Sequence, residues 1–429
     1  MSGILGCLAG LADPKAGRSV RWTPLAASLA AVLMALDPSC TLGVRCEDTL
    51  GCMSKDFTRR RRVGKTYNGL LKALERQSDV VLPVLRADLR ARVLRALEMV
   101  PKVSGWTLLA VDGTKEDLPR TRDHEQIFGI ADNGACPQAF VTAIVEVQAG
   151  LLWDWRIGIA RSNEREHLRE MASDLPDDAL LLGDGGYFGY PQWSALDKSG
   201  KSFLIRVGGN VRLLQELFPD ARIERQGDIV YAWPVHEQSK VPPLRLRLIA
   251  VGSKKDRVYL LTNVLDHAKL SRRSAGAIYR LRWGIELFYR TLKRTLGYAK
   301  LRSRSGRRGK IELEWGLITA TILALIGTHA LHRRHRDPRR QSPAGMLRVM
   351  RAALLRGGRG RPDKALAALD REIARAVKDP YRRRKSKRSR HNPETKNTPF
   401  PQHLQPPKVR RATPQERRKA KKSHPSLIV

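Results

Sequence analysis

Acidic residues are scarce in this chain. Its 429 residues include 42 Asp and Glu against 80 Lys and Arg, so the formal net charge is +38. That charge lies far outside the range of a neutral enzyme and favours a polyanionic partner, of which nucleic acid is the commonest. An anionic membrane surface fits less well, because the cations are spread over many segments instead of one amphipathic helix. We therefore expect nucleic acid as the partner and no membrane.

Cysteine is also rare. Five cysteines are an odd number scattered through a long chain, which argues against a disulfide framework and for a reducing compartment. Cys40, Cys46 and Cys52 recur every six residues, which is not the CxxC spacing of a zinc site. The N-terminus lacks the basic stretch of a signal peptide, and no G-x-x-x-x-G-K-[ST] phosphate loop is present. We predict a cytoplasmic, nucleoid-associated protein without an ATP-driven helper activity.

The stretch from Ser271 to Gly297 is typical of one long amphipathic helix, with a serine near its start and a glycine to end it. Fourteen Lys or Arg but one acid, Glu286, lie between Lys269 and Lys310. At about 100° per residue, Tyr279, Arg282, Glu286 and Lys293 fall within roughly 60° of one face. A separate apolar stripe would dock on a core. It consists of Ile278, Leu281, Ile285, Phe288, Leu292 and Leu296.

Two interpretations of Glu286 are open from spacing alone. The carboxylate could pair with Arg282 or Arg290 one turn away on a charged helix face. It could instead bind a metal ion close to phosphates that the neighbouring bases hold. The pattern Tyr279-x2-Arg282-x3-Glu286-x6-Lys293 resembles the Tyr-Arg-Glu-Lys signature of bacterial insertion-sequence transposases of the DDE type, in the group of the fourth insertion-sequence family.

Two aspartates follow compact apolar runs upstream of that signature. Asp112-Gly-Thr comes after Thr107-Leu-Leu-Ala-Val, and Asp184-Gly-Gly comes after Ala179-Leu-Leu-Leu-Gly. Carboxylates after buried strands lie where α/β sheets present ligand-binding groups, although either aspartate alone could form a turn. With Glu286 they give the order Asp, Asp, Glu of the transposase family. The nearby Glu116 and Asp117 make Asp112 the less secure choice.

The rest of the chain suggests an α/β fold with six parts. The resemblance implies an RNase H-like catalytic core, and strand-like pieces such as Leu244 to Leu248 and Val258 to Thr262 indicate a mostly β insertion. Trp233 in that insertion could hold a distorted DNA end, but a core tryptophan is the better interpretation. We predict a helical N-terminal region at 1–100, the core at 101–200 and 266–335, the insertion at 201–265, a helical extension at 336–380 and a disordered basic tail at 381–429.

Helices in the first hundred residues are predicted at Pro24 to Leu36, Thr41 to Met53, Tyr67 to Arg76 and Val80 to Val100. A basic linker at 57–65 lies between them and is compatible with a DNA-binding module, or with a bundle that mediates dimer contacts. The apolar run from Trp315 to Leu331 fits a buried core helix. The basic stretch from Leu301 to Lys310 is typical of a loop that contacts phosphates.

The resemblance implies the chemistry and the partners. Asp112, Asp184 and Glu286 would be catalytic and would bind Mg²⁺, for which Mn²⁺ can substitute. The partner would be double-stranded DNA, as transposon ends and as target, with a homodimer in the DNA complex. The expected DNA contacts are Tyr279, Arg282, Lys293, Arg290, Lys300, Arg302 and Arg304.

Three other classes of protein remain open. The chain could be a transposase-derived DNA-binding protein that is no longer catalytic, although all three carboxylates are present. It could be a nucleic-acid packaging protein, which the charge alone permits, or a nuclease with the same metal site that joins no ends. The sequence gives neither the terminal repeats nor the target preference.

Overall fold

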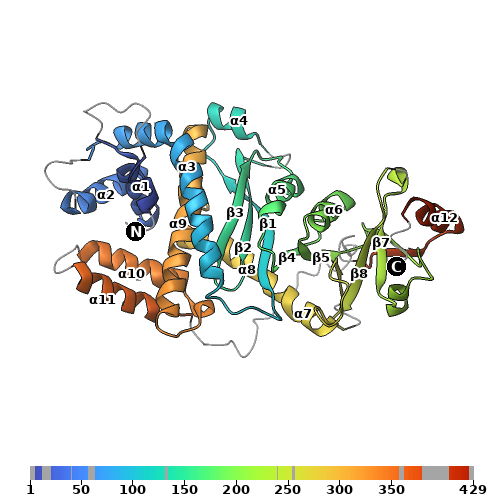
Figure 1. Cartoon of the computed structure of the whole chain (residues 1–429). Coiled ribbons are helices and arrows are strands. Elements are labelled where there is room, and N and C mark those ends of the chain that lie inside the picture. The colour runs from blue at the N-terminus through green and yellow to red at the C-terminus, as the bar shows by residue number, and fades with distance from the viewer. Residues whose placement is uncertain are drawn as a thin grey trace, which may run out of the picture. The chain divides into compact units, whose positions relative to one another are not determined.

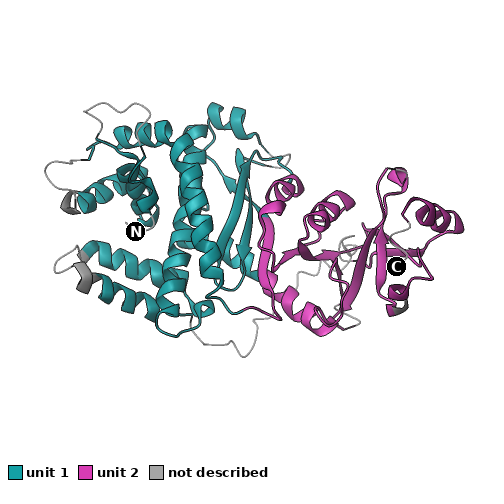
Figure 2. Ribbon diagram, viewed as in Figure 1, with its two compact units in different colours: residues 1–101, 113–163, 283–378 teal, residues 102–112, 164–282, 379–429 magenta. Residues whose placement is uncertain are grey.

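The chain divides into two compact units that each combine distant stretches of sequence (Figure 2). Unit 1 comprises Met1–Pro101, Gly113–Asn163 and Trp283–Lys378, and unit 2 comprises Lys102–Asp112, Glu164–Arg282 and Asp379–Val429. The structure is a computed structural model. It describes residues 5–11, 21–39, 41–56, 63–130, 134–238, 240–253, 257–356, 362–378 and 405–424. Cys40 and most of the predicted basic linker at 57–65 lie outside these ranges.

Unit 1 is mainly helical. Helices α3 and α9 lie side by side, and both pack on strand β3, which pairs antiparallel with β2 (Figure 1). The strands of this unit are β2 (Gln138–Glu146), β3 (Leu151–Gly158) and the second half of β1 (Thr107–Asp117). The helices are α1 (Pro24–Leu36), α2 (Leu42–Asp56), α3 (Tyr67–Leu97), α4 (Arg122–Phe128), α8 (Gly284–Arg290), α9 (Gly306–His332), α10 (Pro343–Arg356) and α11 (Pro362–Arg375). Short turns of helix are η1 (Leu5–Leu8), η6 (Thr291–Thr295) and η7 (Pro338–Arg340).

The predicted N-terminal helices agree with this unit, with one difference. Thr23 caps α1 by accepting a hydrogen bond from the backbone N–H of Ala26, and Asp37 ends the helix. The two helices expected on either side of residue 78 are one helix, α3, with Pro83 inside it. The continuous buried face of α3, which includes Leu74, Ser78 and Val81, outweighs the loss of a backbone donor at the proline.

Helix α9 confirms the predicted core helix but begins earlier. Most of it is buried inside the protein, although by length and composition it is the one helix of the described chain that could cross a membrane. Its first turns contain residues 306–310, so the predicted phosphate-contacting loop is wrong for that part. There Arg307 pairs with Asp79 at 2.9 Å and Arg308 with Glu75 at 2.8 Å, which ties α9 to α3.

Unit 2 is built on a mixed sheet in the order β10-β6-β7-β8-β9-β5-β4-β1, where β1 contributes its first half. β1, β4 and β5 run parallel, and β5, β9, β8, β7 and β6 alternate in direction. The strands are β4 (Ala179–Gly183), β5 (Ser202–Val207), β6 (Arg212–Gln215), β7 (Ile229–Ala232), β8 (Leu244–Val251), β9 (Val258–Thr262) and β10 (Lys408–Arg411). The helices are α5 (Glu164–Met171), α6 (Tyr190–Lys198), α7 (Arg272–Arg280) and α12 (Pro414–Ser423), with the turns η2 (Ala172–Asp174), η3 (Arg222–Gln226) and η4 (Val235–Glu237).

The C-terminal segment corrects the predicted disordered tail. Residues 379–404 and 425–429 lie outside the described ranges, but 405–424 form β10 and α12. β10 pairs parallel with β6, and Ala412 and Ala420 join a buried cluster with Leu214, Phe218 and Trp233. Trp233 is therefore a core residue, as the sequence favoured. The tail was misjudged because small alanines make its apolar contacts, and these carry little signal in a basic sequence.

Candidate active site

Asp112 lies within strand β1, whereas the sequence predicted that it follows the end of the strand. The strand continues to Asp117, but its parallel pairing with β4 stops at Ala110, which is opposite Leu182. Beyond that point the half-buried Asp112 carboxylate faces Arg282, with Oδ2 3.6 Å from the Arg282 Nη1. The sequence could not show this difference, because the length of a strand does not reveal where its pairing with a given neighbour stops.

Asp184 follows β4 directly, as predicted. Its Oδ1 accepts a hydrogen bond from the backbone N–H of Gly186 at 2.8 Å, which fixes the carboxylate over the turn after the strand. Because β1 and β4 are parallel neighbours, both aspartates come after their paired segments at the same edge of the unit 2 sheet.

Tyr279 and Arg282 approach these aspartates from helix α7 and the turn after it. Ser271 caps α7 by accepting from the backbone N–H of Ser274 at 3.1 Å, as the sequence indicated. Burial raises the pKa of Tyr279 to about 12, against the opposing charge of Arg282, to which its hydroxyl is hydrogen-bonded. The phenol is thus neutral at physiological pH and acts as a hydrogen-bonding group.

The predicted single helix from Ser271 to Gly297 is broken. α7 ends at Arg280, and the 3-10 turn η5 (Leu281–Trp283) precedes α8, which passes into the π-helical turn η6. Gly297, with φ of +79°, ends the series as expected. The boundary between the two units falls inside η5, so Tyr279 and Arg282 belong to unit 2, whereas Glu286 and Lys293 belong to unit 1.

Glu286 lies on α8, which packs on β2 in unit 1. Its side chain is half-buried, whereas that of Arg290, one turn later, is exposed. Gly284 sets the distance of α8 from the turn after β2, because a Cβ there would lie 2.1 Å from the carbonyl oxygen of Val147. Glu286 is thus held on a helix that has little freedom to move against its sheet.

Lys293 is engaged by a carboxylate that the sequence did not assign to the site. Its Nζ lies 3.3 Å from Glu116 Oε1 and donates to the carbonyl oxygen of Lys115 at 2.7 Å. The Glu116 side chain is fully buried, and burial raises its pKa to about 7 although Lys293 opposes the shift. Glu116 therefore positions Lys293, while Asp117 accepts from Gln138 at 2.9 Å.

The remaining predicted DNA contacts follow the helix. Lys300 and Arg304 are exposed, and like Arg290 they form no ion pair with any residue that the structure describes. Arg302 is half-buried, and its guanidinium donates to the carbonyl oxygen of Gly297 at 3.2 Å. Arg302 therefore braces the turn after η6, whereas Arg290, Lys300 and Arg304 are available to a polyanion.

Glu164 is a residue of this site that the sequence did not single out. It begins α5 in unit 2, and burial, followed by the charges of Asp184 and Asp112, raises the pKa of its carboxyl to about 7. An acid in the first turn of a helix is usually explained by the helix dipole, and Glu166 two residues later has the same signal. Only the fold distinguishes them, because the Glu166 side chain is 61% exposed.

Three comparisons with known proteins bear on this arrangement. Residues 105–323 match the family described as Transposase DDE domain. The chain belongs to the DDE transposase family. It is 28% identical over 235 residues to the transposase InsG for insertion sequence element IS4 of Escherichia coli (strain K12), across 51% of this chain and 52% of that protein. The match thus spans about half the length of that relative.

A solved structure is also similar. The piggyBac transposase in its synaptic complex with hairpin DNA aligns with a TM-score of 0.43 and 13% identity, over 86% of this chain and 83% of that one. At this score the likeness does not decide the fold. The family match is the stronger finding for the site, since its range contains Asp112, Asp184, Glu286 and the whole Tyr-Arg-Glu-Lys signature of this DDE transposase.

DDE transposases generally use divalent metal ions. Within the described residues no group of three His, Cys, Asp or Glu is close enough to hold an ion together. The donor chemistry fits a hard cation, however. A Cβ built on Gly186 would lie 2.5 Å from Glu164 Oε1 and 3.0 Å from Asp184 Oδ1, so both carboxylate oxygens lie beside a residue that has no side chain.

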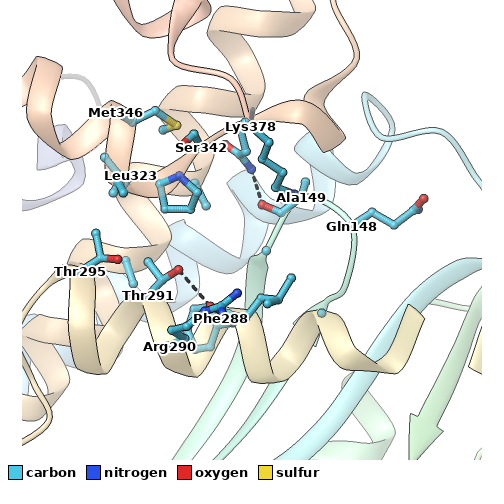
Figure 3. Close-up of a pocket in the computed structure, with 18 of the residues that line it drawn as sticks. Gln148, Ala149, Phe288, Arg290, Thr291, Thr295, Leu323, Ser342, Met346 and Lys378 are labelled. Carbon is cyan, nitrogen blue, oxygen red and sulfur yellow. Dashed lines mark hydrogen bonds between the residues drawn. The ribbon is translucent and has the colours of Figure 1, made fainter. Parts of the chain in front are cut away.

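A separate pocket of about 420 Å³ is lined in part by residues of α8 (Figure 3). Phe288, Arg290 and Thr291 line it together with Gln148, Ala149 and Lys378, and Glu286 does not. This pocket is therefore not part of the carboxylate site.

Proposed function

We propose that this chain is a DNA transposase that binds the terminal inverted repeats of an insertion sequence, cuts DNA at its ends and joins them to a target. The observation that supports this most is the family match over 105–323, which contains the three carboxylates and the signature. Arg282 of the signature pairs with Asp112, as a shared site would require. An RNase H-like core with a β insertion is part of this proposal.

In this proposal Asp112, Asp184 and Glu286 bind Mg²⁺, with Mn²⁺ as a substitute. Two divalent ions about 3.5–4 Å apart stabilise the attacking and leaving oxygens of a phosphoryl transfer. The carboxylates of Asp112 and Asp184 are held in place by Arg282 and by the backbone N–H of Gly186. The protein thus orients the donors before any substrate arrives.

The cations of the signature hold the DNA backbone in this proposal. Arg282 can present its planar group to a phosphate, and Tyr279 can donate its hydroxyl proton. Lys293, Arg290, Lys300 and Arg304 are the cations of unit 1 that would contact phosphates, whereas Arg302, also predicted as a DNA contact, braces the turn after η6. Since Lys293 pairs with Glu116, phosphate binding would compete with that ion pair.

The experiment uses labelled DNA that carries the terminal repeats flanking the gene. The native protein and Glu286→Gln are incubated with it in Mg²⁺ or Mn²⁺, and cut and joined products are separated. We expect metal-dependent cutting and joining that Glu286→Gln abolishes while DNA binding persists. Light scattering on paired ends should show a homodimer.

Other outcomes point to other functions. Binding without cleavage by the native protein would indicate a transposase-derived DNA-binding protein that is no longer catalytic. Cutting without joining would indicate a nuclease, and cutting that survives in Glu286→Gln would move the active site away from Glu286.

A further inference from the structure

Glu164 is a carboxylate that family membership does not explain. It comes from the start of α5, an element separate from β1 and β4, yet its Oε1 and the Asp184 Oδ1 both lie close to Gly186, 2.5 Å and 3.0 Å from the position that a Cβ of that residue would take. An isolated glutamate at a helix start would point its charge into water. Glu164 instead lies against another carboxylate.

The neighbouring contacts keep Glu164 in that place. Arg165 stacks over Phe188, with its guanidinium carbon 4.8 Å from the ring centroid, and donates to the carbonyl oxygen of Phe188 at 3.4 Å. Leu168 and Met171 bury the other face of α5. The start of the helix is therefore fastened to the turn that follows Asp184.

Two partly buried carboxylates that face each other repel unless a cation lies between them. Arg165, which stacks over Phe188, and the side chain of Tyr187 offset part of this repulsion at Glu164, while Arg282 pairs with Asp112. A divalent ion with oxygen ligands satisfies both the charge and the donor chemistry.

We propose that Glu164 is a further carboxylate of the metal site and binds the divalent ion together with Asp184. This inference rests on the proposed function, because it takes Asp184 as a metal ligand. It adds a donor outside the set of Asp112, Asp184 and Glu286, beside a residue where a Cβ would collide with the Glu164 carboxylate.

Metal binding itself tests the proposal, without any DNA reaction. Full-length protein is titrated with Mn²⁺, and free Mn²⁺ is measured by its electron paramagnetic resonance signal. We expect Glu164→Gln to weaken Mn²⁺ binding about tenfold or more, in the range found when groups around a metal are removed. Glu166→Gln, on the same helix but exposed, is the matched control and should bind as the native protein does.

Gly186→Ala provides a second variant that keeps every carboxylate. Its methyl group would occupy the point 2.5 Å from Glu164 Oε1, so it should weaken Mn²⁺ binding as Glu164→Gln does. Circular dichroism confirms that each variant is folded, and Glu164→Asp replaces Glu164→Gln if that variant is not.

Asp184→Asn separates this inference from the proposed function. If Asp184→Asn loses Mn²⁺ binding while both Glu164→Gln and Gly186→Ala retain it, Glu164 is not a ligand and the proposed metal site stands. If Asp184→Asn also binds Mn²⁺ as tightly as the native protein, the proposed metal site at Asp184 fails, and this inference fails with it.

Discussion

Glu146 of β2 is a buried carboxyl outside the proposed chemistry. It accepts hydrogen bonds from the backbone N–H groups of Ala149 at 2.7 Å and Gln148 at 3.0 Å. Burial nevertheless raises its pKa from 4.5 to about 7. The folded state therefore holds the proton more tightly than the unfolded state does. The resulting stabilisation is complete below pH 4.5 and is lost as the pH rises through 7.

Glu146→Gln cannot ionise and keeps one of the two oxygens that accept these hydrogen bonds. The lost acceptor should lower the free energy of unfolding at pH 5 by about 1 kcal/mol. At pH 8 the absent charge outweighs that loss, so the variant should have a free energy of unfolding about 2 kcal/mol higher than the native protein. Urea unfolding of native and variant protein at both pH values measures the difference. Glu166→Gln controls for the loss of one negative charge. An equal effect of Glu146→Gln at both pH values would contradict the prediction.

The pair of Glu116 and Lys293 gives a second prediction at this scale. At pH 8, Lys293→Met leaves the fully buried Glu116 carboxylate without its cation, which should cost about 3 kcal/mol of stability. Glu116→Gln removes the buried charge and should cost less, because the Lys293 side chain is 29% exposed and keeps water as a partner. The double variant should be more stable than Lys293→Met alone. Denaturant curves of the four proteins test this, and additive effects would show that the pair is not coupled.

At the scale of elements, the close approach of α8 to β2 depends on Gly284. A Cβ there would lie 2.1 Å from the Val147 carbonyl oxygen and 2.7 Å from the Val147 Cβ, and neither is the end of a flexible side chain. Gly284→Ala should therefore displace α8 and lower the free energy of unfolding by about 1–3 kcal/mol. The matched control is Gly51→Ala in α2, where nothing lies within 4 Å of the new atom.

The two alanine variants should change stability in opposite directions. Gly51→Ala removes the entropic cost of a helical glycine and should stabilise by about 0.5–1 kcal/mol. Thermal unfolding of both variants compares them directly. A neutral Gly284→Ala would mean that α8 can move away from β2 without cost.

The series from α7 to η6 shows what a sequence can reveal of an element. Its cap at Ser271, its end at Gly297 and its apolar face follow from residue type and spacing. The break at η5 does not follow from them. Each residue of a 3-10 turn rotates about the helix axis by more than a residue of an α-helix, and each residue of a π-turn rotates by less. The larger rotation in η5 and the smaller rotation in η6 offset each other, so the apolar residues keep an average spacing near 3.6 residues per turn.

The sequence likewise predicts only part of the candidate active site. Asp184 and the signature follow from local pattern, because each lies where a strand or a helix presents it. Glu164 and Glu116 do not, since the charges that act on them, those of Asp184 and Lys293, come from distant parts of the sequence. A buried partner leaves no periodic signal in a single sequence.

At the scale of the whole molecule, the last described segment completes unit 2. The cations of β10 and α12 pair with acids from far away in the chain: Arg411 with Glu216 at 2.9 Å and Lys421 with Asp220 at 2.7 Å. The ring of His424 lies 6.5 Å from that of Trp233, edge to face. A basic composition therefore does not prevent this segment from folding, because the acids it needs come from the β part of unit 2.

Removal of this segment should weaken one unit selectively. A chain that ends at residue 404 lacks β10 and leaves β6 without its parallel neighbour. It also exposes the cluster around Phe218 and Trp233 that Ala412 and Ala420 cover. We expect faster amide hydrogen exchange in β6 and β7 and increased binding of a hydrophobic dye, with unchanged exchange in α3 and α9. A chain that ends at residue 424 is the control. Unchanged exchange in β6 after the longer truncation would mean that unit 2 is stable without the segment.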